Sequence, residues 1–220
     1  MRWAVAFALS LASAAAAVAA PLCGDTESCL AAIERAQKTT QSLSARFEQT
    51  KHLSLMTEPI VGRGRFALRH VACPPNAEKE RCPDGKTPEI LWQSEDPPLR
   101  LVIRADGVEL PPEVAREAGE GSKALTSALQ QVGSLLSGSV AGVARIGEVE
   151  AQPSPAGISV HLVPRQAAVR ELFSAVDLEF VAPHLVLQSI RISESLGDRL
   201  EITFSEIHRN DEIAEAAFRP

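Results

Sequence analysis

The stretch "GRGRFALRHVAC", Gly62 to Cys73, alternates between two kinds of side chain. Successive side chains of a β-strand point to opposite faces of its sheet. One parity holds small, apolar and imidazole side chains, and the other holds alanine and three arginines. The stretch therefore predicts a strand of an antiparallel sheet with one apolar face and one solvated, charged face. The first parity is Gly62, Gly64, Phe66, Leu68 and His70, and the second is Arg63, Arg65, Ala67 and Arg69.

The same alternation of apolar and polar residues recurs along most of the chain. Turn signals such as Asp106-Gly107 and Gly197-Asp198 separate the alternating runs. Besides a strand near "ARFEQTK", strands are expected at 89–94, 99–107, 157–165, 170–180, 184–195 and 198–209. Consecutive strands joined by short turns predict a mainly β protein built as an antiparallel meander.

Helical spacing comes before the first strand. Leu30, Ile33, Ala36, Leu43 and Phe47 recur at intervals of about one helical turn. This spacing predicts an amphipathic helix from Cys29 to Phe47, which hands over to the strand near "ARFEQTK".

A second amphipathic helix is predicted inside the segment 111–147. Ser122 is a suitable N-cap for it, and Gly138 is a suitable stop. A helix with one apolar stripe, inserted in the middle of a sheet, needs an apolar surface to lie on. Its stripe consists of Leu125, Ala128, Leu129, Val132, Leu135 and Leu136.

The N-terminus has the layout of a cleaved secretory signal over residues 1–20: Arg2, an uncharged apolar run, then small residues. Residues 21–220 are then expected to be a single exported domain. Removal of Arg2 changes the formal net charge from −6 to −7 (21 basic against 28 acidic residues). That balance argues against nucleic-acid binding and against general adhesion to anionic lipid surfaces.

The four cysteines allow three pairings. Proximity favours Cys23–Cys29 and Cys73–Cys82, each closing a short loop in an oxidising compartment. The second pair would pin an inserted polar loop at 73–86. A zinc site made of His70, Cys73 and Cys82 is the alternative, but paired Cys-x-x-Cys spacing is absent.

Catalysis finds little support in the sequence. It contains no Gly-x-Ser-x-Gly, His-Glu-x-x-His or Gly-Lys-Ser/Thr motif. The five histidines lie on different predicted strands, without metal-ligand spacing. We therefore expect neither an enzyme, nor a cofactor, nor a metal site.

Several motifs occur together in the order and approximate spacing of a known family. They are "SLSARFEQTK", "GRGRFAL", "ILWQSEDPP", "RADG", "VHLVPR" and "IAEAAFRP". In this order the chain resembles the periplasmic lipoprotein carriers, the LolA family, from Cys29 to Pro220. The resemblance implies an unclosed antiparallel β-barrel, a half-barrel, with a helical lid over an apolar cavity. That cavity would hold the acyl chains of a lipoprotein on its way to the outer membrane.

The alternating strands supply candidates for the cavity and its lid. Strand alternation predicts the same lining residues as ordinary core, so both interpretations stay open. The lining candidates are Phe47, Phe66, Leu68, Ile90, Trp92, Leu101 and Ile103, and the lid candidates are Leu125, Leu129, Val132 and Leu136.

In the family, an inward-facing arginine late in this strand latches the empty carrier shut. Counting from Gly62, the matching position is His70, while Arg69 lies one residue early and, by parity, on the outer face. A bulge near Cys73 would turn Arg69 inward. Otherwise His70 takes the role, and the latch would weaken or strengthen as the imidazole titrates near its unperturbed pKa of about 6.5. The remaining alternative is that His70 is a satisfied strand-end histidine.

The resemblance also implies partners. They are lipoprotein acyl chains, an inner-membrane lipoprotein-releasing ABC transporter and an outer-membrane lipoprotein receptor, and the protein would act as a periplasmic monomer. The alternative is a related half-barrel that works as a sensor, a regulatory module or a carrier of another hydrophobic cargo, because fold alone does not determine function.

Overall fold

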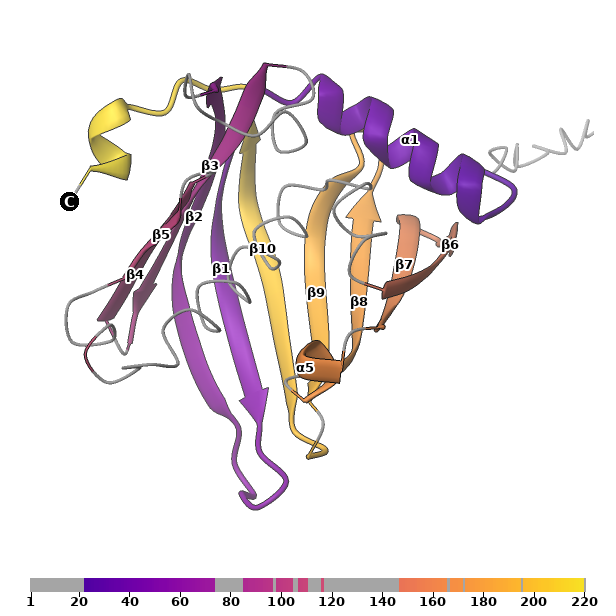
Figure 1. The fold of residues 1–220 in the computed structure, drawn as a ribbon, viewed down its shortest axis with the longest axis vertical. Helices are drawn as coiled ribbons and strands as arrows, with labels where there is room; N and C mark the ends of the chain where they lie inside the picture. Colours follow the sequence, from indigo (N-terminus) through magenta and orange to yellow (C-terminus); the bar gives the residue numbers. More distant parts are fainter. Residues whose placement is uncertain are drawn as a thin grey trace, which may run out of the picture.

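Ten strands form one antiparallel sheet in the computed structural model, which describes residues 22–73, 85–96, 98–104, 107–110, 116, 147–165, 167–171, 173–194 and 196–219 (Figure 1). The first five are β1 (Ser42–His52), β2 (Ile60–Ala72), β3 (Lys86–Glu95), β4 (Pro98–Arg104) and β5 (Gly107–Glu109). The second five are β6 (Gly147–Pro153), β7 (Gly157–Pro164), β8 (Phe173–Val181), β9 (Val186–Glu194) and β10 (Arg199–Arg209).

The strand order is β5-β4-β3-β2-β1-β10-β9-β8-β7-β6. The chain therefore starts in the middle of the sheet, runs out to β5, resumes at the opposite end with β6 and returns to pair β10 with β1. In the part of the chain that the structure describes, β5 and β6 do not pair with each other. The predicted mainly β, unclosed antiparallel architecture is confirmed.

Helix α1 (Thr26–Lys38) is shorter than predicted. Its start is fixed by Asp25, whose Oδ1 accepts a hydrogen bond from the Ser28 amide at 2.8 Å. The predicted end at Phe47 was wrong, because after Thr40 the apolar residues change from helical spacing to alternation, and β1 buries Leu43, Ala45 and Phe47 while exposing Arg46. Phe47 therefore lies on a strand.

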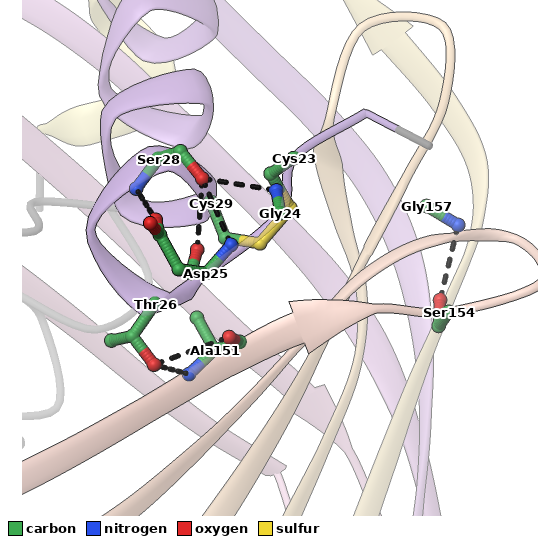
Figure 2. Close-up of a disulfide and its surroundings, with 9 residues drawn as sticks. All are labelled: Cys23, Gly24, Asp25, Thr26, Ser28, Cys29, Ala151, Ser154 and Gly157. Atoms are coloured by element: carbon green, nitrogen blue, oxygen red, sulfur yellow. Dashed lines mark hydrogen bonds between the residues drawn. A yellow bond between two sulfur atoms is a disulfide. The ribbon is translucent and has the colours of Figure 1, made fainter. Parts of the chain in front are cut away.

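The start of α1 is tied down covalently and covers an edge of the sheet (Figure 2). The predicted disulfide Cys23–Cys29 is present. Between these two cysteines, the Thr26 hydroxyl lies 3.2 Å from the amide nitrogen of Ala151 and 3.3 Å from the carbonyl oxygen of Ala151. Because β6 is the last strand of the sheet, this contact satisfies backbone groups that an edge strand leaves free.

The far end of α1 reaches the turn between β8 and β9, where the Gln37 side chain donates to the Leu185 carbonyl oxygen at 3.2 Å. Figure 1 shows the helix lying across one end of β6–β9. Cys29 and Ile33 bury its apolar stripe against the sheet, at 0% and 1% exposure. The helix therefore covers one end of the strands β6–β9.

Most predicted strands agree with the structure to within a few residues. Strand β8 begins at Phe173 instead of Arg170, because Ala167–Arg170 forms the short helix α5. Strand β6 was not predicted, since "GEVEAQP" is short of apolar residues. Residues 111–115 and 117–146, which hold the predicted lid helix, lie outside the described residues, as do the signal at 1–20, Cys82 and Asp106, so the predictions for them stay predictions.

Candidate hydrophobic binding face

One face of the sheet, here called the inner face, carries the predicted lining residues of β2, β3 and β4. Residues directly opposite each other in an antiparallel pair share a face. The register places six of the candidates in two cross-strand rows, and five of the six are buried. The rows are Phe66–Trp92–Leu101 and Leu68–Ile90–Ile103.

An aromatic cluster joins these rows to the centre of the sheet. The Phe47 ring on β1 stacks on Trp92, with ring centroids 3.8 Å apart. Phe66 meets Trp92 edge-on at 6.4 Å and Phe204 of β10 at 5.3 Å. Such pairs add stabilisation beyond the area they bury. The seventh lining candidate, Phe47, thus lies beside the other six, and Phe204 is an inner-face aromatic that the sequence reasoning did not list.

One glycine of the opening stretch, Gly64, makes room for this cluster. A Cβ atom on Gly64 would lie 2.5 Å from Cζ of Phe47 and 2.0 Å from the carbonyl oxygen of Gln93. Any side chain at this position would therefore displace the Phe47 ring or the neighbouring strand. Gly64 therefore leaves the space in which the Phe47 ring of β1 lies against β2.

The apolar inner face continues over the other half of the sheet. Every strand from β7 to β10 contributes buried side chains to the same core as Phe47 and Phe66, and α1 covers one end of it. These residues are Ile158, Val160, Leu162, Val176, Leu178, Phe180, Leu187, Ile190, Ile202 and Phe204. The inner face is thus one continuous hydrophobic surface, and its core residues and its predicted cargo contacts share it.

The outer face of β2–β4 has a different chemistry. Arg69 pairs with Glu89 at 2.6 Å, and Arg104 pairs with the same carboxylate at 3.2 Å and with Glu109 at 2.9 Å. The four side chains form a ladder of alternating charge across the strands. Arg104 donates hydrogen bonds to the carboxylates of Glu109 and Glu89, and these bonds raise its pKa and favour its charged form.

The C-terminal segment closes a small apolar patch beside this ladder. Phe218, in the short 3-10 helix η3 (Glu215–Phe218), is 1% exposed and packs on Ala67, Leu91 and Val102. The Arg69 guanidinium lies over the Phe218 ring, 4.5 Å from its centroid. Sequence reasoning missed this cover, although the apolar residues on the arginine parity, such as Ala67, were a signal for it.

The structure separates the two latch candidates. Strand β2 pairs with β3 in unbroken register from Gly64 to Ala72, so no bulge turns Arg69 inward, and the parity prediction that Arg69 lies on the outer face is confirmed. His70 stays on the inner-face parity, at the α1 end of the strand. Its role as a latch stays a prediction.

His70 is poorly solvated. Its Nδ1 is buried and has no hydrogen-bond partner among the described residues. Burial lowers the pKa of His70, the positive charge of Lys86 lowers it further, and the backbone carbonyl groups of Gln41 and Thr40 act in the opposite direction. The lowered pKa favours the neutral form of the imidazole.

Two other features bear on the choice of site. A groove on the outer face is lined by polar side chains such as Asp177, Arg191 and Glu201, which suits water better than an apolar ligand. In the described ranges, no group of three His, Cys, Asp or Glu residues is placed to hold a metal ion, and no helix is both long and apolar enough to cross a membrane. Cys82 of the zinc alternative lies outside these ranges.

Comparison with known proteins gives limited matches. No protein-family sequence profile matches the chain. Solved structures with a similar fold include a DUF1329 family protein from Desulfovibrio piger (TM-score 0.43, 11% identity, 88% of this chain and 97% of that chain) and a LolA superfamily protein from Nitrosomonas europaea (0.41, 10%, 90% and 98%). MucB in complex with MucA has a TM-score of 0.44 at 10% identity, covering 89% of this chain and 60% of that chain.

Among curated proteins, the outer-membrane lipoprotein carrier protein of Hahella chejuensis is 34% identical over 84 residues. The match covers 38% of this chain and 39% of the relative, so the chain spans well under half the length of the curated protein it matches. Over these residues the chain is similar in sequence to a lipoprotein carrier, which confirms the resemblance that its motifs indicated.

Proposed function

We propose that this protein binds lipoprotein acyl chains on its inner face and carries lipoproteins through the periplasm from the inner to the outer membrane. The observation that carries the proposal is the pair of apolar rows, Phe66–Trp92–Leu101 and Leu68–Ile90–Ile103, on the inner face of an unclosed sheet. The partial likeness to a lipoprotein carrier supports it.

Hydrophobic burial alone would give useful affinity. Each CH₂ group of an acyl chain that leaves water contributes about 0.8 kcal/mol, so partial burial of several chains binds without a specific polar contact. Aromatic faces such as Trp92, which is half-buried next to Phe47, would contact a flexible chain without demanding one geometry. Selectivity would then rest on the acylated N-terminus of a lipoprotein and not on one residue.

The first test is native mass spectrometry of the protein isolated from a periplasmic extract, repeated after mild delipidation. One acylated polypeptide bound per protein supports the proposal. Bound free lipid without polypeptide would favour a carrier of another hydrophobic cargo. An empty protein would favour a sensor or regulatory module, whose protein partner would then be sought by crosslinking.

A matched pair of variants tests whether the acyl chains bind to the inner face. Ile90 and Leu91 are adjacent on β3, both are buried, and they face opposite sides of the sheet. Ile90→Ala and Leu91→Ala should lose similar stability, about 2–5 kcal/mol. Only Ile90→Ala should weaken uptake of an acylated peptide. Equal uptake by both variants would remove the inner face from the proposal.

The lid has its own test. Leu129 lies on the predicted apolar stripe of the segment 111–147. Leu129→Glu should abolish uptake of an acylated peptide while leaving the thermal unfolding transition of the sheet in place. For the carrier cycle we propose an inner-membrane lipoprotein-releasing ABC transporter as donor and an outer-membrane receptor as acceptor, with the protein acting as a monomer and without a catalytic step.

A further inference from the structure

Exposed apolar side chains gather at the end of the sheet opposite α1. Leu55 is 97% exposed and Met56 is 52% exposed in the turn between β1 and β2, and Leu196 is 85% exposed in the turn between β9 and β10. Ile60 and Val61, at the start of β2, are each 48% exposed. Apolar groups that a fold leaves in water at one place mark a surface for contact with another molecule.

The two turns form one tip. The Ser54 amide donates to Oδ1 of Asp198 at 2.7 Å, which joins the β1–β2 turn to the β9–β10 turn. Figure 1 shows both hairpins at the end of the sheet opposite α1, with the β1–β2 hairpin extending furthest. We call Leu55, Met56 and Leu196, backed by Ile60 and Val61, the apolar tip.

We propose that the apolar tip enters the hydrocarbon-facing layer of a lipid bilayer when the protein approaches a membrane. This extends the proposed function by naming the contact at this end of the molecule, and its test does not depend on cargo uptake. The shape of the tip favours lipid over protein. A specific protein interface covers about 800 Å² on each partner. Two adjoining turns offer convex, isolated side chains instead of such an area, whereas a bilayer accepts apolar side chains one at a time.

The charges near the tip explain why the contact would be apolar. Lys51 pairs with Glu194 at 3.0 Å, and Arg199 pairs with Glu201 at 3.0 Å. Asp198 accepts the Ser54 bond already described. The charges around the tip also include the exposed Glu58 of the β1–β2 turn and Arg191, which pairs with Glu201. Taken together they nearly cancel, so they leave little net field to attract anionic lipid headgroups. Binding should therefore be independent of salt and of the share of anionic lipid, unlike the binding of a basic protein surface.

The test is flotation of the purified protein with vesicles of phosphatidylcholine and of phosphatidylglycerol, at low and high salt. The protein should float with both kinds of vesicle at both salt concentrations. Burial of one leucine side chain changes an equilibrium by about tenfold or more, so Leu55→Glu should weaken binding at least that much, and Leu55→Glu with Leu196→Glu should abolish it. Val163→Glu, at an exposed apolar residue of β7, is the matched control and should float normally.

Insertion itself has a separate readout. Met56→Trp should show a blue-shifted emission with vesicles and quenching by bromine on the acyl chains, and Val163→Trp should show neither. Unchanged flotation of the double variant, loss of flotation at high salt, or unaltered emission of Met56→Trp would overturn the proposal. A wild-type dimer in sedimentation velocity that Leu55→Glu dissociates, without vesicle binding, would also overturn it in favour of self-association.

Folding and cargo binding are controlled in the same experiment. The substituted side chains are exposed, so the thermal unfolding transition of each variant should match that of the wild type. Uptake of an acylated peptide in vesicle-free solution should be unchanged by the double variant. Conversely, Ile90→Ala should lose uptake and keep flotation. Failure of the membrane proposal and failure of the carrier proposal therefore give different results.

Discussion

The two faces of β2, β3 and β4 are made by the same three strands and use apolar residues in opposite ways. On the outer face the apolar patch is small, and the chain covers it with its own Phe218 and borders it with paired charges. On the inner face the apolar rows run from β4 through the centre of the sheet into the second half. The covered patch on the outer face serves stability, whereas the continuous apolar inner face is the one that we propose binds a ligand.

The largest effect should come from removing one ring from each face. Phe47 and Phe218 are both nearly inaccessible, at 2% and 1% exposure. Phe47→Ala and Phe218→Ala should each lower the free energy of unfolding by about 3–5 kcal/mol, measured by urea denaturation. Uptake of an acylated peptide below the unfolding transition should fall only for Phe47→Ala. A similar loss of uptake in both variants would mean that the two faces do not differ in function.

A smaller loss should follow from adding one methyl group to the inner face. Gly64→Ala forces contacts with Phe47 and with the Gln93 carbonyl oxygen, and overpacking of this kind costs about 1–3 kcal/mol. Gly62→Ala is the matched control, because its closest neighbour is the flexible Gln49 side chain. If thermal denaturation shows Gly62→Ala to be the more damaging change, the space for the Phe47 ring is not what Gly64 provides.

The outer face should respond to the loss of one charge. The Glu89 side chain is 13% exposed and serves both Arg69 and Arg104, so Glu89→Gln should cost about 1–3 kcal/mol at neutral pH. The pair Arg63–Glu48 has side chains that are 72% and 50% exposed, and Glu48→Gln should cost no more than about 0.5 kcal/mol. Chemical denaturation at low and high salt measures the free energy of unfolding of both variants. If Glu89→Gln and Glu48→Gln lose the same stability, the charge ladder does not stabilise the fold.

The smallest effect should be the pH dependence due to His70. Burial lowers its pKa, so between its folded pKa and about 6.5, the ordinary value, the unfolded chain binds more protons than the folded one. The contribution of His70 to stability is therefore full above about pH 6.5 and is lost as the pH falls toward the folded pKa. His70→Gln should flatten the stability curve in this window. Urea denaturation at several pH values measures this curve, and an unchanged curve in His70→Gln would exclude His70 as its source.

Sequence reasoning placed most strands because alternation is a local property. The inner-face rows were predictable for the same reason, since parity within "GRGRFAL" and "EILWQS" decides which side chains share a face. It failed at the end of α1, because Leu43 and Phe47 also fit a helical spacing, although Leu43, Ala45 and Phe47 alternate and pair with β2 and β10 as a strand. It also failed for β6, because this strand has few apolar residues of its own and is stabilised by pairing with β7 and by the contact of Thr26 with Ala151.

The sequence by itself determined the fold class, the two-faced character of each strand, the Cys23–Cys29 disulfide and the outward parity of Arg69, because each depends on residues close together in the chain. Tertiary structure alone decided that Phe218 covers Ala67, that Gly64 admits the Phe47 ring, and that Leu55 and Leu196 share one tip. These contacts join segments far apart in sequence, and their partners are set by the strand order, which no local pattern encodes.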